Sequence, residues 1–408
     1  MKVIDLFAGA GGLSEGFRQE GYDILAHVEM DKSACNTLRT REAFYYLKNQ
    51  NLLNIYKDYL LHNITQKELY SYIPQEILDK VIEAEISNKT IPTIFNRIDE
   101  LIGEEVIDLV IGGPPCQAYS TAGKARDPNK MKDDPRNYFY RYYTRFLRKY
   151  QPKMFVFENV RGILTAQEGK VFENIKRNMK NAGYKVDYRI LNASEFGVSQ
   201  FRERVIIIGW KKDIPFEYPD FNREIVTPTI RTLFEDLPKI NAGESLNGEN
   251  QYSTTANEEI RGIRNKNWNI LTQHIARPNN ENDLSIYRLV VETWNKQSKV
   301  LKYNEFPQDL KTHKKDSIFL DRYKNVKYET FSHTLVAHIA KDGHYYIHPD
   351  IEQNRSLTVR EAARIQSFPD DFYFEDSRTA AFKQIGNAVP PLMAKEIARK
   401  LKSTELLV

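Results

Sequence analysis

The sequence contains little cysteine and no long apolar run. Only two of its 408 residues are cysteines, Cys35 and Cys116, which excludes a disulfide framework and a zinc site built from several cysteines. No apolar run approaches the roughly 18 residues that cross a membrane. The N-terminus, MKVIDLFAGAGG, lacks the basic segment and the cleavage site of a signal peptide. We therefore expect a soluble cytoplasmic protein with two domains, no metal and no membrane partner.

A strong net charge is also absent, but the charge is unevenly distributed. The chain has a net charge of +4, whereas residues 117–153 contain ten Lys or Arg against three Asp or Glu. Residues 261–328 contain fourteen against seven, so the rest of the chain is acidic. Two basic segments on a near-neutral chain indicate either a surface for a polyanion or two solvated faces without a partner.

The first 210 residues alternate short apolar runs with amphipathic stretches. The apolar runs are 3–7, 24–28, 106–111, 154–157 and 205–209, with helical patterns between them at 13–20, 137–150 and 170–181. This alternation predicts an α/β fold with a parallel, doubly wound sheet. We interpret the charged, helix-favouring block 42–100 as an elaboration of that domain.

The character of the chain changes after Trp210. Residues 215–350 are rich in Asn, Lys, Tyr and Pro and show little α/β rhythm, which predicts a smaller, irregular domain. A regular pattern returns near Ser356, and 392–401 predicts an amphipathic terminal helix. We expect a catalytic and cofactor-binding domain over 1–214, a second domain over 215–380, and a segment 381–408 that returns to the first domain.

Glycines follow the first predicted strand directly, in DLFAGAGG. They allow a ligand to approach the backbone, and the next helix points its free N–H groups at that place. Glu29 ends the following strand, where a carboxylate can accept hydrogen bonds from both hydroxyls of a ribose. The GxGG spacing lets an adenosine cofactor without a pyrophosphate, such as S-adenosylmethionine, compete with NAD. A tight turn without a ligand is the alternative.

Cys116 stands in GGPPCQAYS, just past the predicted strand 106–111. Ligands bind at that edge of an open α/β sheet, and the prolines hold the thiol at a set position. Most free cysteines are buried and structural, as we expect of Cys35. The turn-forming neighbours of Cys116 instead indicate a nucleophile.

Two more segments carry charged side chains near predicted strand ends. Glu158, in MFVFENV, is either a solvated strand end or an acid and hydrogen-bond clamp beside the nucleophile. In SQFRERV, a period of two places Gln200, Arg202 and Arg204 on one face of a strand. Such a face would bind an oxyanion, a phosphate or a base edge, unless it is a surface strand of alternating charge.

In their order and spacing, these motifs resemble those of the DNA (cytosine-5)-methyltransferases of the bacterial modification type. RSLTVREAARIQSFPDDF and QIGNAVPP resemble the last two motifs of that family, and only 42–100 and 215–350 fall outside the resemblance. It implies a Rossmann-like, S-adenosylmethionine-dependent domain and a target-recognition domain over 215–380. The implied reaction is methyl transfer from S-adenosylmethionine to carbon 5 of a flipped-out cytosine in a specific double-stranded DNA sequence, through a covalent bond between Cys116 and carbon 6. Such an enzyme belongs to a restriction-modification system or is an orphan modification enzyme.

The resemblance also implies roles for individual residues. Cys116 would act with Glu158, Arg202 and Arg204 on the cytosine. Met30 stands where the family often has a larger apolar or aromatic residue against the adenine. The residues expected to bind the cofactor are Phe7, Ala8, Gly9, Gly11, Gly12, Leu13, Glu29, Met30, Asn63, Ile64, Pro114, Tyr138, Asn387, Ala388 and Val389, with Ile98–Asp99 as an alternative to Asn63–Ile64. Those expected to contact DNA are Gln117, Ser120, Lys124, Arg126 and Gln200.

Three other functions compete with this interpretation. A tRNA cytosine-5 methyltransferase of similar layout would carry a Cys-Phe-Thr element, but no cysteine follows Cys116. A catalytically silent DNA-binding protein would not need Cys116, Glu158 and Arg204 together, and nothing resembles the hydride-transfer site of a nicotinamide-dependent oxidoreductase. We expect a monomer that associates with the nucleoid when on DNA, with a cognate restriction endonuclease acting separately.

Overall fold

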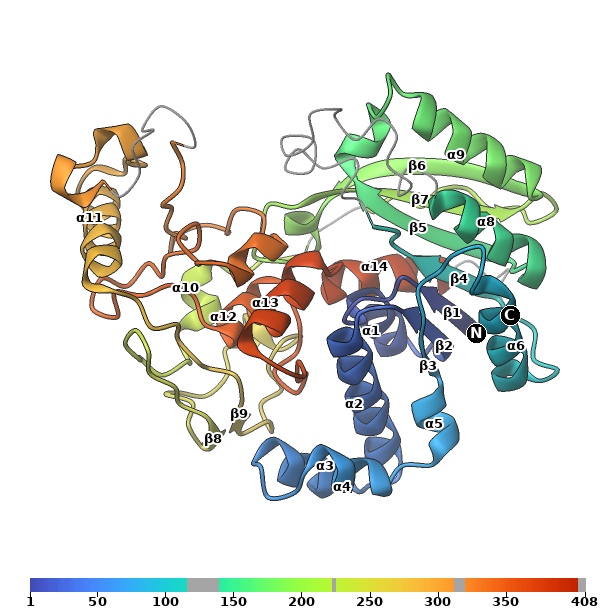
Figure 1. Ribbon diagram of the computed structural model, residues 1–408, viewed down its shortest axis with the longest axis horizontal. Helices are drawn as coiled ribbons and strands as arrows, with labels where there is room; N and C mark the ends of the chain where they lie inside the picture. Colours follow the sequence, from blue (N-terminus) through green and yellow to red (C-terminus); the bar gives the residue numbers. More distant parts are fainter. Residues whose placement is uncertain (116–138, 222–224, 312–319, 403–408) are drawn as a thin grey trace.

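The computed structural model describes residues 1–115, 139–221, 225–311 and 320–402 (Figure 1). Within these ranges no helix is long and apolar enough to cross a membrane. A seven-stranded sheet forms one side of the molecule, and a more irregular unit built around short helices forms the other.

The sheet has the strand order β3-β2-β1-β4-β5-β7-β6. All neighbouring strands are parallel except β7, which runs antiparallel to both β5 and β6. The predicted α/β class is therefore confirmed, but the sheet is not fully parallel. A short connection joins β6 to β7, and such a connection suits an antiparallel pair. The strands are β1 (Lys2–Leu6), β2 (Asp23–Glu29), β3 (Val81–Glu83), β4 (Leu109–Gly112), β5 (Met154–Val160), β6 (Tyr184–Asn192) and β7 (Glu203–Lys211).

Helices cover both faces of the sheet, which is why its central strands are continuous apolar runs. One face packs against α6 (Ile91–Ile102), α8 (Phe139–Tyr150) and α9 (Lys170–Asn181). The other face packs against α1 (Gly12–Gln19) and α14 (Pro391–Lys402). A Cβ atom on Gly16 would lie 2.4 Å from the Lys395 backbone nitrogen, so glycine is what permits α1 and α14 to approach this closely. The C-terminal helix thus lies against the N-terminal one.

The block 42–100 has two different parts. Its first part continues α2 (Lys32–Asn49) and forms α3 (Leu53–Leu60), α4 (Gln66–Ser71) and α5 (Gln75–Asp79). These helices share a core with Trp268 and Ile270, and Ile270 belongs to the antiparallel pair of β8 (Gly248–Glu249) and β9 (Ile270–Leu271). The second part supplies β3 and α6 to the sheet. Only the first part is therefore an elaboration, and it connects the sheet unit to the second unit.

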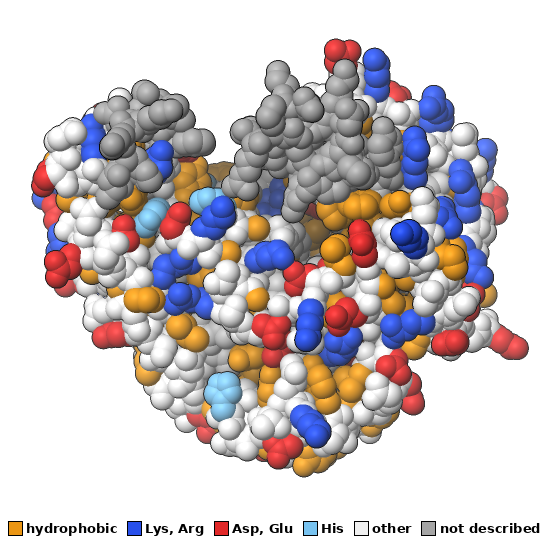
Figure 2. All heavy atoms as spheres, in the orientation of Figure 1, with side chains coloured by type: hydrophobic (Ala, Val, Ile, Leu, Met, Phe, Trp, Pro, Cys, Tyr) orange, Lys and Arg blue, Asp and Glu red, His pale blue; other side chains and the backbone are white. Residues whose placement is uncertain are grey.

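The second unit is organised around a buried arginine. Arg364 donates to Asp370 (Nη2–Oδ2 2.6 Å) and to Asp236, and all three side chains are almost completely buried. Because a buried charge needs a partner, these ion pairs fix helix α12 (Val359–Ile365) at the centre of the unit. Figure 2 shows the molecule hollowed between the part of this unit that contains α11 and the sheet unit. The helices of this unit are α10 (Ile230–Phe234), α11 (Glu281–Gln297), α12 (Val359–Ile365) and α13 (Arg378–Asn387). Among the described residues, the 3-10 turns are η2 (Arg161–Leu164), η3 (Ala193–Phe196), η4 (Glu258–Ile260), η5 (Tyr303–Glu305), η6 (Gln308–Leu310) and η7 (Ala337–Ala340).

Candidate active site

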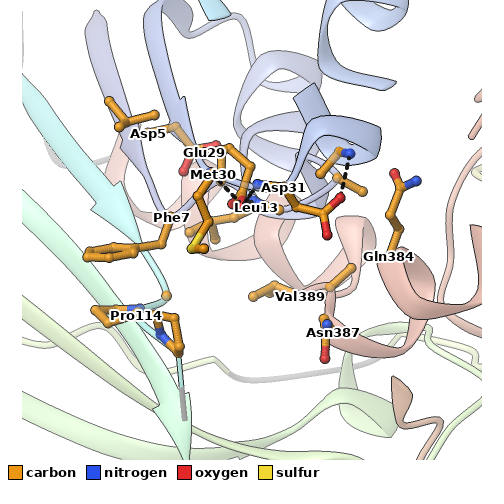
Figure 3. A pocket seen from close by; sticks show the side chains of 18 of the residues that line it. Asp5, Phe7, Leu13, Glu29, Met30, Asp31, Pro114, Gln384, Asn387 and Val389 are labelled. Carbon is orange, nitrogen blue, oxygen red and sulfur yellow. Dashed lines mark hydrogen bonds between the residues drawn. The ribbon is translucent and has the colours of Figure 1, made fainter. Parts of the chain in front are cut away.

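A cavity of about 600 Å³ opens at the carboxyl ends of the central strands (Figure 3). From β1 the chain first adds β2 and β3 on one side of the sheet and then adds β4 and β5 on the other side. The cavity lies at this switch in strand order, which is the usual ligand site of an open α/β sheet. Strand ends and the segment after α13 line it from opposite sides. The predicted cofactor residues that line it are Phe7, Ala8, Gly9, Leu13, Glu29, Met30, Pro114, Asn387, Ala388 and Val389.

The Glu29 carboxylate organises one end of the cavity. Its Oε2 atom accepts a hydrogen bond from the Gly9 backbone N–H (2.8 Å), and its Oε1 atom accepts from Met30 and Asp31 (2.8 Å each). Burial raises the pKa of Glu29, and these N–H donors oppose that effect. They occupy three of about four acceptor positions of a carboxylate, which leaves one for a ligand hydroxyl rather than the two that we expected.

Gly11 and Gly12 do not line the cavity. Gly11 has a φ of 81° at the start of α1. A Cβ atom on Gly12 would lie 2.2 Å from the Val389 carbonyl oxygen. These two predicted cofactor residues therefore serve the turn and the close approach of the 387–389 segment, which forms the opposite wall.

Glu158 and Arg204 form an ion pair in another part of the same cavity. The Arg204 Nε atom lies 2.7 Å from Glu158 Oε1, and each side chain is only about a tenth exposed. The pairing of β5 with β7 brings them together, because it places Val160 opposite Arg204. The pair presents an acceptor and donors side by side, as the edge of a flat polar ring would require.

The two prolines of GGPPCQAYS also line this cavity. Asn159 Nδ2 donates to the Pro114 carbonyl (3.1 Å), so the strand end that carries Glu158 also holds the proline turn. Pro115 directly precedes Cys116 in the chain. Cys116 itself and five other predicted site residues lie outside the described residues: Gln117, Ser120, Lys124, Arg126 and Tyr138.

Arg202 and Gln200 do not line the cavity that Arg204 lines, although the sequence predicts one shared strand face for the three residues. Strand β7 begins only at Glu203, so the alternation of side chains does not extend back to them. Arg202 is 1% exposed, and its guanidinium donates to the carbonyls of Leu335 (2.6 Å) and Ala388 (2.9 Å). Gln200 is fully buried, and its Oε1 atom accepts from the Leu335 N–H (2.7 Å). Both residues tie this loop to the second unit, and their contacts with cytosine and DNA stay a prediction.

Asn63 and Ile64, which the sequence predicts as cofactor contacts, do not line the cavity. Asn63 is exposed and donates to Asp58 (3.1 Å), and Ile64 packs against the α2–α4 cluster. The alternative Ile98–Asp99 is equally remote, because Ile98 is core and Asp99 pairs with Lys149. Glu85 and Ile86, which follow β3, line the cavity instead. Their signal is an acidic residue followed by Ile after a strand, but β3 has only three residues and shows no readable period.

One ion pair that the sequence does not predict spans the cavity. Lys383 on α13 lies 2.6 Å from Asp31, which follows β2, and both residues line the cavity. Met30 is 60% exposed at the same end. The cavity is thus closed by a contact between the sheet and the segment near the C-terminus.

A buried charge network lies behind the cavity wall. Asp5 lines the cavity and contacts His27 Nδ1 (3.3 Å), whose Nε2 atom contacts Glu42 (3.1 Å). Burial by itself lowers the pKa of His27, but the two carboxylates outweigh it and the pKa is raised. Burial by itself raises the pKa of Glu42, but Arg18 and His27 bring it to about 2. The network therefore holds charged groups beneath β1 and β2.

Comparison with known proteins agrees with this geometry. The chain matches the C-5 cytosine-specific DNA methylase family over residues 1–64 and 65–403. It is 42% identical to the type II methyltransferase M.Bpa9945I of Bacillus paralicheniformis, with 98% of each chain covered. It is 31% identical to the type II methyltransferase M1.HphI of Haemophilus parahaemolyticus, over 98% of this chain and 86% of that one.

Solved structures share the fold. A prophage-encoded DNA modification methyltransferase from E. coli superposes with a TM-score of 0.65 at 23% identity, with 100% of this chain and 99% of that chain covered. The methyltransferase EhMeth of Entamoeba histolytica superposes with a TM-score of 0.57 at 14% identity, over 99% and 98% of the two chains. The match over almost the whole chain, together with the close relatives, shows that this protein belongs to the C-5 cytosine-specific DNA methylase family and is a DNA cytosine-5-methyltransferase.

Proposed function

We propose that the protein transfers a methyl group from S-adenosylmethionine to carbon 5 of a flipped-out cytosine in a specific duplex sequence, through a covalent Cys116 adduct. The observation that carries this proposal is the single cavity that joins the Glu29 end to the Glu158–Arg204 pair, with Pro114 and Pro115 on its wall. A donor site and an acceptor site in one cavity are what direct transfer between two bound molecules requires.

The residues at the Glu29 end fit an adenosine cofactor. Glu29 has one acceptor position left for a ribose hydroxyl, and Met30 and Ile86 offer apolar contacts for a base. Asn387 and Val389 would close the cavity over the methionine part, near Phe7. When bound, S-adenosylmethionine supplies an electrophilic methyl group on a sulfonium.

The Glu158–Arg204 pair would bind the cytosine. Glu158 would accept from the exocyclic amine and stabilise protonated N3, while Arg204 would donate to O2. A cytosine stacked in a duplex cannot reach side chains inside this cavity, so the base must be flipped out, at a cost of a few kcal/mol.

Cys116 would supply the covalent step. Its thiolate adds to carbon 6, which forms the S–C6 bond and makes carbon 5 nucleophilic as an enamine. After carbon 5 has taken the methyl group, it loses its proton, and the S–C6 bond breaks to regenerate the thiolate and the aromatic ring. The methyl group thus replaces one proton, and the nucleophile is restored.

The partners follow from the reaction and the relatives. We propose double-stranded DNA as the substrate, a type II restriction-modification context as in the relatives, and 215–380 as the target-recognition domain. Ser120, Lys124 and Arg126 would contact phosphates near the flipped base. Exchanging 215–350 with the corresponding residues of a relative of known specificity is expected to change the sequence that is methylated; a folded, active chimera that keeps its original sequence would contradict this assignment.

The reaction is tested by trapping the adduct. Duplex DNA that carries 5-fluorocytosine in the target is expected to form a covalent, denaturant-resistant complex in the presence of S-adenosylmethionine, because fluorine cannot leave as a proton does. The Cys116→Ala variant should bind cofactor and DNA but form no complex. Wild-type turnover in that variant, or no transfer of labelled methyl to any duplex by the wild type, would refute the proposal.

A further inference from the structure

The second unit carries two lysines that stand out from the other charged residues. Lys324 and Lys327 are half-buried, and within the described ranges neither forms an ion pair with a carboxylate. Both belong to the basic segment 261–328. A half-buried ammonium without a carboxylate partner is costly unless another group compensates for the lost water.

Aromatic rings hold both ammonium groups in place. The Nζ atom of Lys327 lies 3.7 Å from the ring centroid of Trp294, on α11, and that of Lys324 lies 5.2 Å from the Tyr345 ring. Such contacts stabilise a cation without neutralising it. The long side chains are therefore ordered while their charge stays available.

The two lysines of this cluster repel each other. Burial, and then repulsion by Lys327, lower the pKa of Lys324, and burial lowers the pKa of Lys327. Burial, with contributions from both lysines, lowers the pKa of the neighbouring His333 to about 3. Asp321 is the nearby acid that favours the charged form of Lys324. An anion placed between the two lysines would relieve this repulsion.

The cluster lies on the segment that runs from α11 to the rim of the active site. At one end is Trp294. At the other end Ser332 donates to the Ser199 carbonyl and accepts from Phe201 (2.9 Å each), just before β7 and Arg204. Figure 2 shows Lys and Arg side chains beside the hollow between the two units. A duplex that occupied this hollow would lie beside these side chains.

We propose that Lys324 and Lys327 bind backbone phosphates of the duplex on the side of the second unit. The proposal rests on the duplex substrate of the proposed function. A phosphate is favoured over a base edge because an ammonium is a compact point charge and the neighbouring rings are already covered by the lysines. The contact would contribute affinity and register, not sequence choice.

The test compares Lys327→Met and Lys324→Met with Lys57→Met. Methionine keeps the apolar contact with the ring and removes the charge. Lys57 is a matched control, because its Nζ atom lies 5.8 Å from the Trp268 ring at the α3 corner, outside the segment from α11 to the active-site rim. Fluorescence anisotropy measures the Kd of the full-length enzyme for a duplex that it methylates and for an unrelated duplex, between about 50 and 200 mM salt.

Each of the two variants is expected to bind both duplexes roughly 15-fold more weakly at the low salt and roughly 4-fold more weakly at the high salt, since one phosphate contact contributes a slope of about 0.9 in log K against log salt. Lys57→Met should bind as the wild type does, and Lys327→Arg should recover most of the affinity. Unchanged binding by Lys327→Met, in an enzyme that still methylates DNA, would overturn this proposal but not the proposed function. A loss confined to the methylated sequence would also overturn it, because it would show base readout.

Discussion

The Arg204 guanidinium lies 2.7 Å from the Glu158 carboxylate, and both side chains line the cavity that Glu29 organises. The pair is formed across β5 and β7, so its geometry depends on the one antiparallel strand inserted between β5 and β6. Each side chain is only about a tenth exposed, so each charge needs the other as a partner. Since both side chains line the cavity, the pair is also positioned for a ligand.

Replacing Glu158 tests the acceptor half of this pair. Glu158→Gln keeps the size of the side chain but removes the charge that would stabilise protonated N3. We expect single-turnover methyl transfer to slow by about 10²–10³-fold, with the Kd for S-adenosylmethionine unchanged. Glu203→Gln is the control, since Glu203 is about half exposed and pairs with Arg161 instead. Equal rates for the two variants would show that Glu158 does not act on the base.

Arg202 and Arg204 should differ in what their loss does. Arg202→Gln leaves the buried carbonyls of Leu335 and Ala388 without their donor, so the free energy of unfolding should fall by about 2–4 kcal/mol. Arg204→Gln should change stability less and methyl transfer more. Chemical denaturation and single-turnover assays of both variants measure the two effects. A large catalytic defect in a fully stable Arg202→Gln enzyme would instead support the prediction that Arg202 holds the cytosine.

His27 predicts a pH dependence of stability. Its pKa is raised by Asp5 and Glu42, so its contribution is complete below the unfolded value of about 6.5 and is lost as the pH rises through the folded pKa. The Tm of the wild type should therefore decline as the pH rises above about 6.5, and His27→Asn should flatten that decline. The exposed His62 provides the control, because it is not part of this buried network. The Tm of His62→Asn should therefore decline with pH as that of the wild type does. An unchanged pH profile in His27→Asn would contradict the role of the network.

Met30 predicts an effect on cofactor affinity. It is 60% exposed at the Glu29 end of the cavity, so a larger ring there has room to stack on the adenine. Met30→Trp is expected to lower the Kd for S-adenosylmethionine by roughly 2- to 10-fold, the value of one aromatic contact. Titration calorimetry measures this, with Leu52→Trp as a control at an exposed position outside the cavity. If Met30→Trp binds more weakly than the wild type, the adenine does not lie against this residue.

The sequence determined the strand-end chemistry. Glycines directly after β1, an acid at the end of β2 and another near the end of β5 all follow apolar runs, and the carboxyl ends of neighbouring parallel strands meet at one edge. The local sequence pattern alone was therefore sufficient to predict that Gly9, Glu29, Pro114 and Glu158 lie at the same edge of the sheet, and all four line the cavity.

Only the tertiary structure decided which neighbours of these residues take part. Arg202 and Arg204 are two positions apart, but β7 begins between them, so one is buried against the second unit and the other faces the cavity. Glu85 could not be predicted as a cavity residue, because β3 is too short to show a period. The ion pair of Lys383 with Asp31 could not be predicted either, because 352 residues separate the two in the chain. Packing of the whole molecule sets the strand boundaries and the contacts between distant segments. The type and spacing of residues at strand ends are local properties, so they can be determined from the sequence alone.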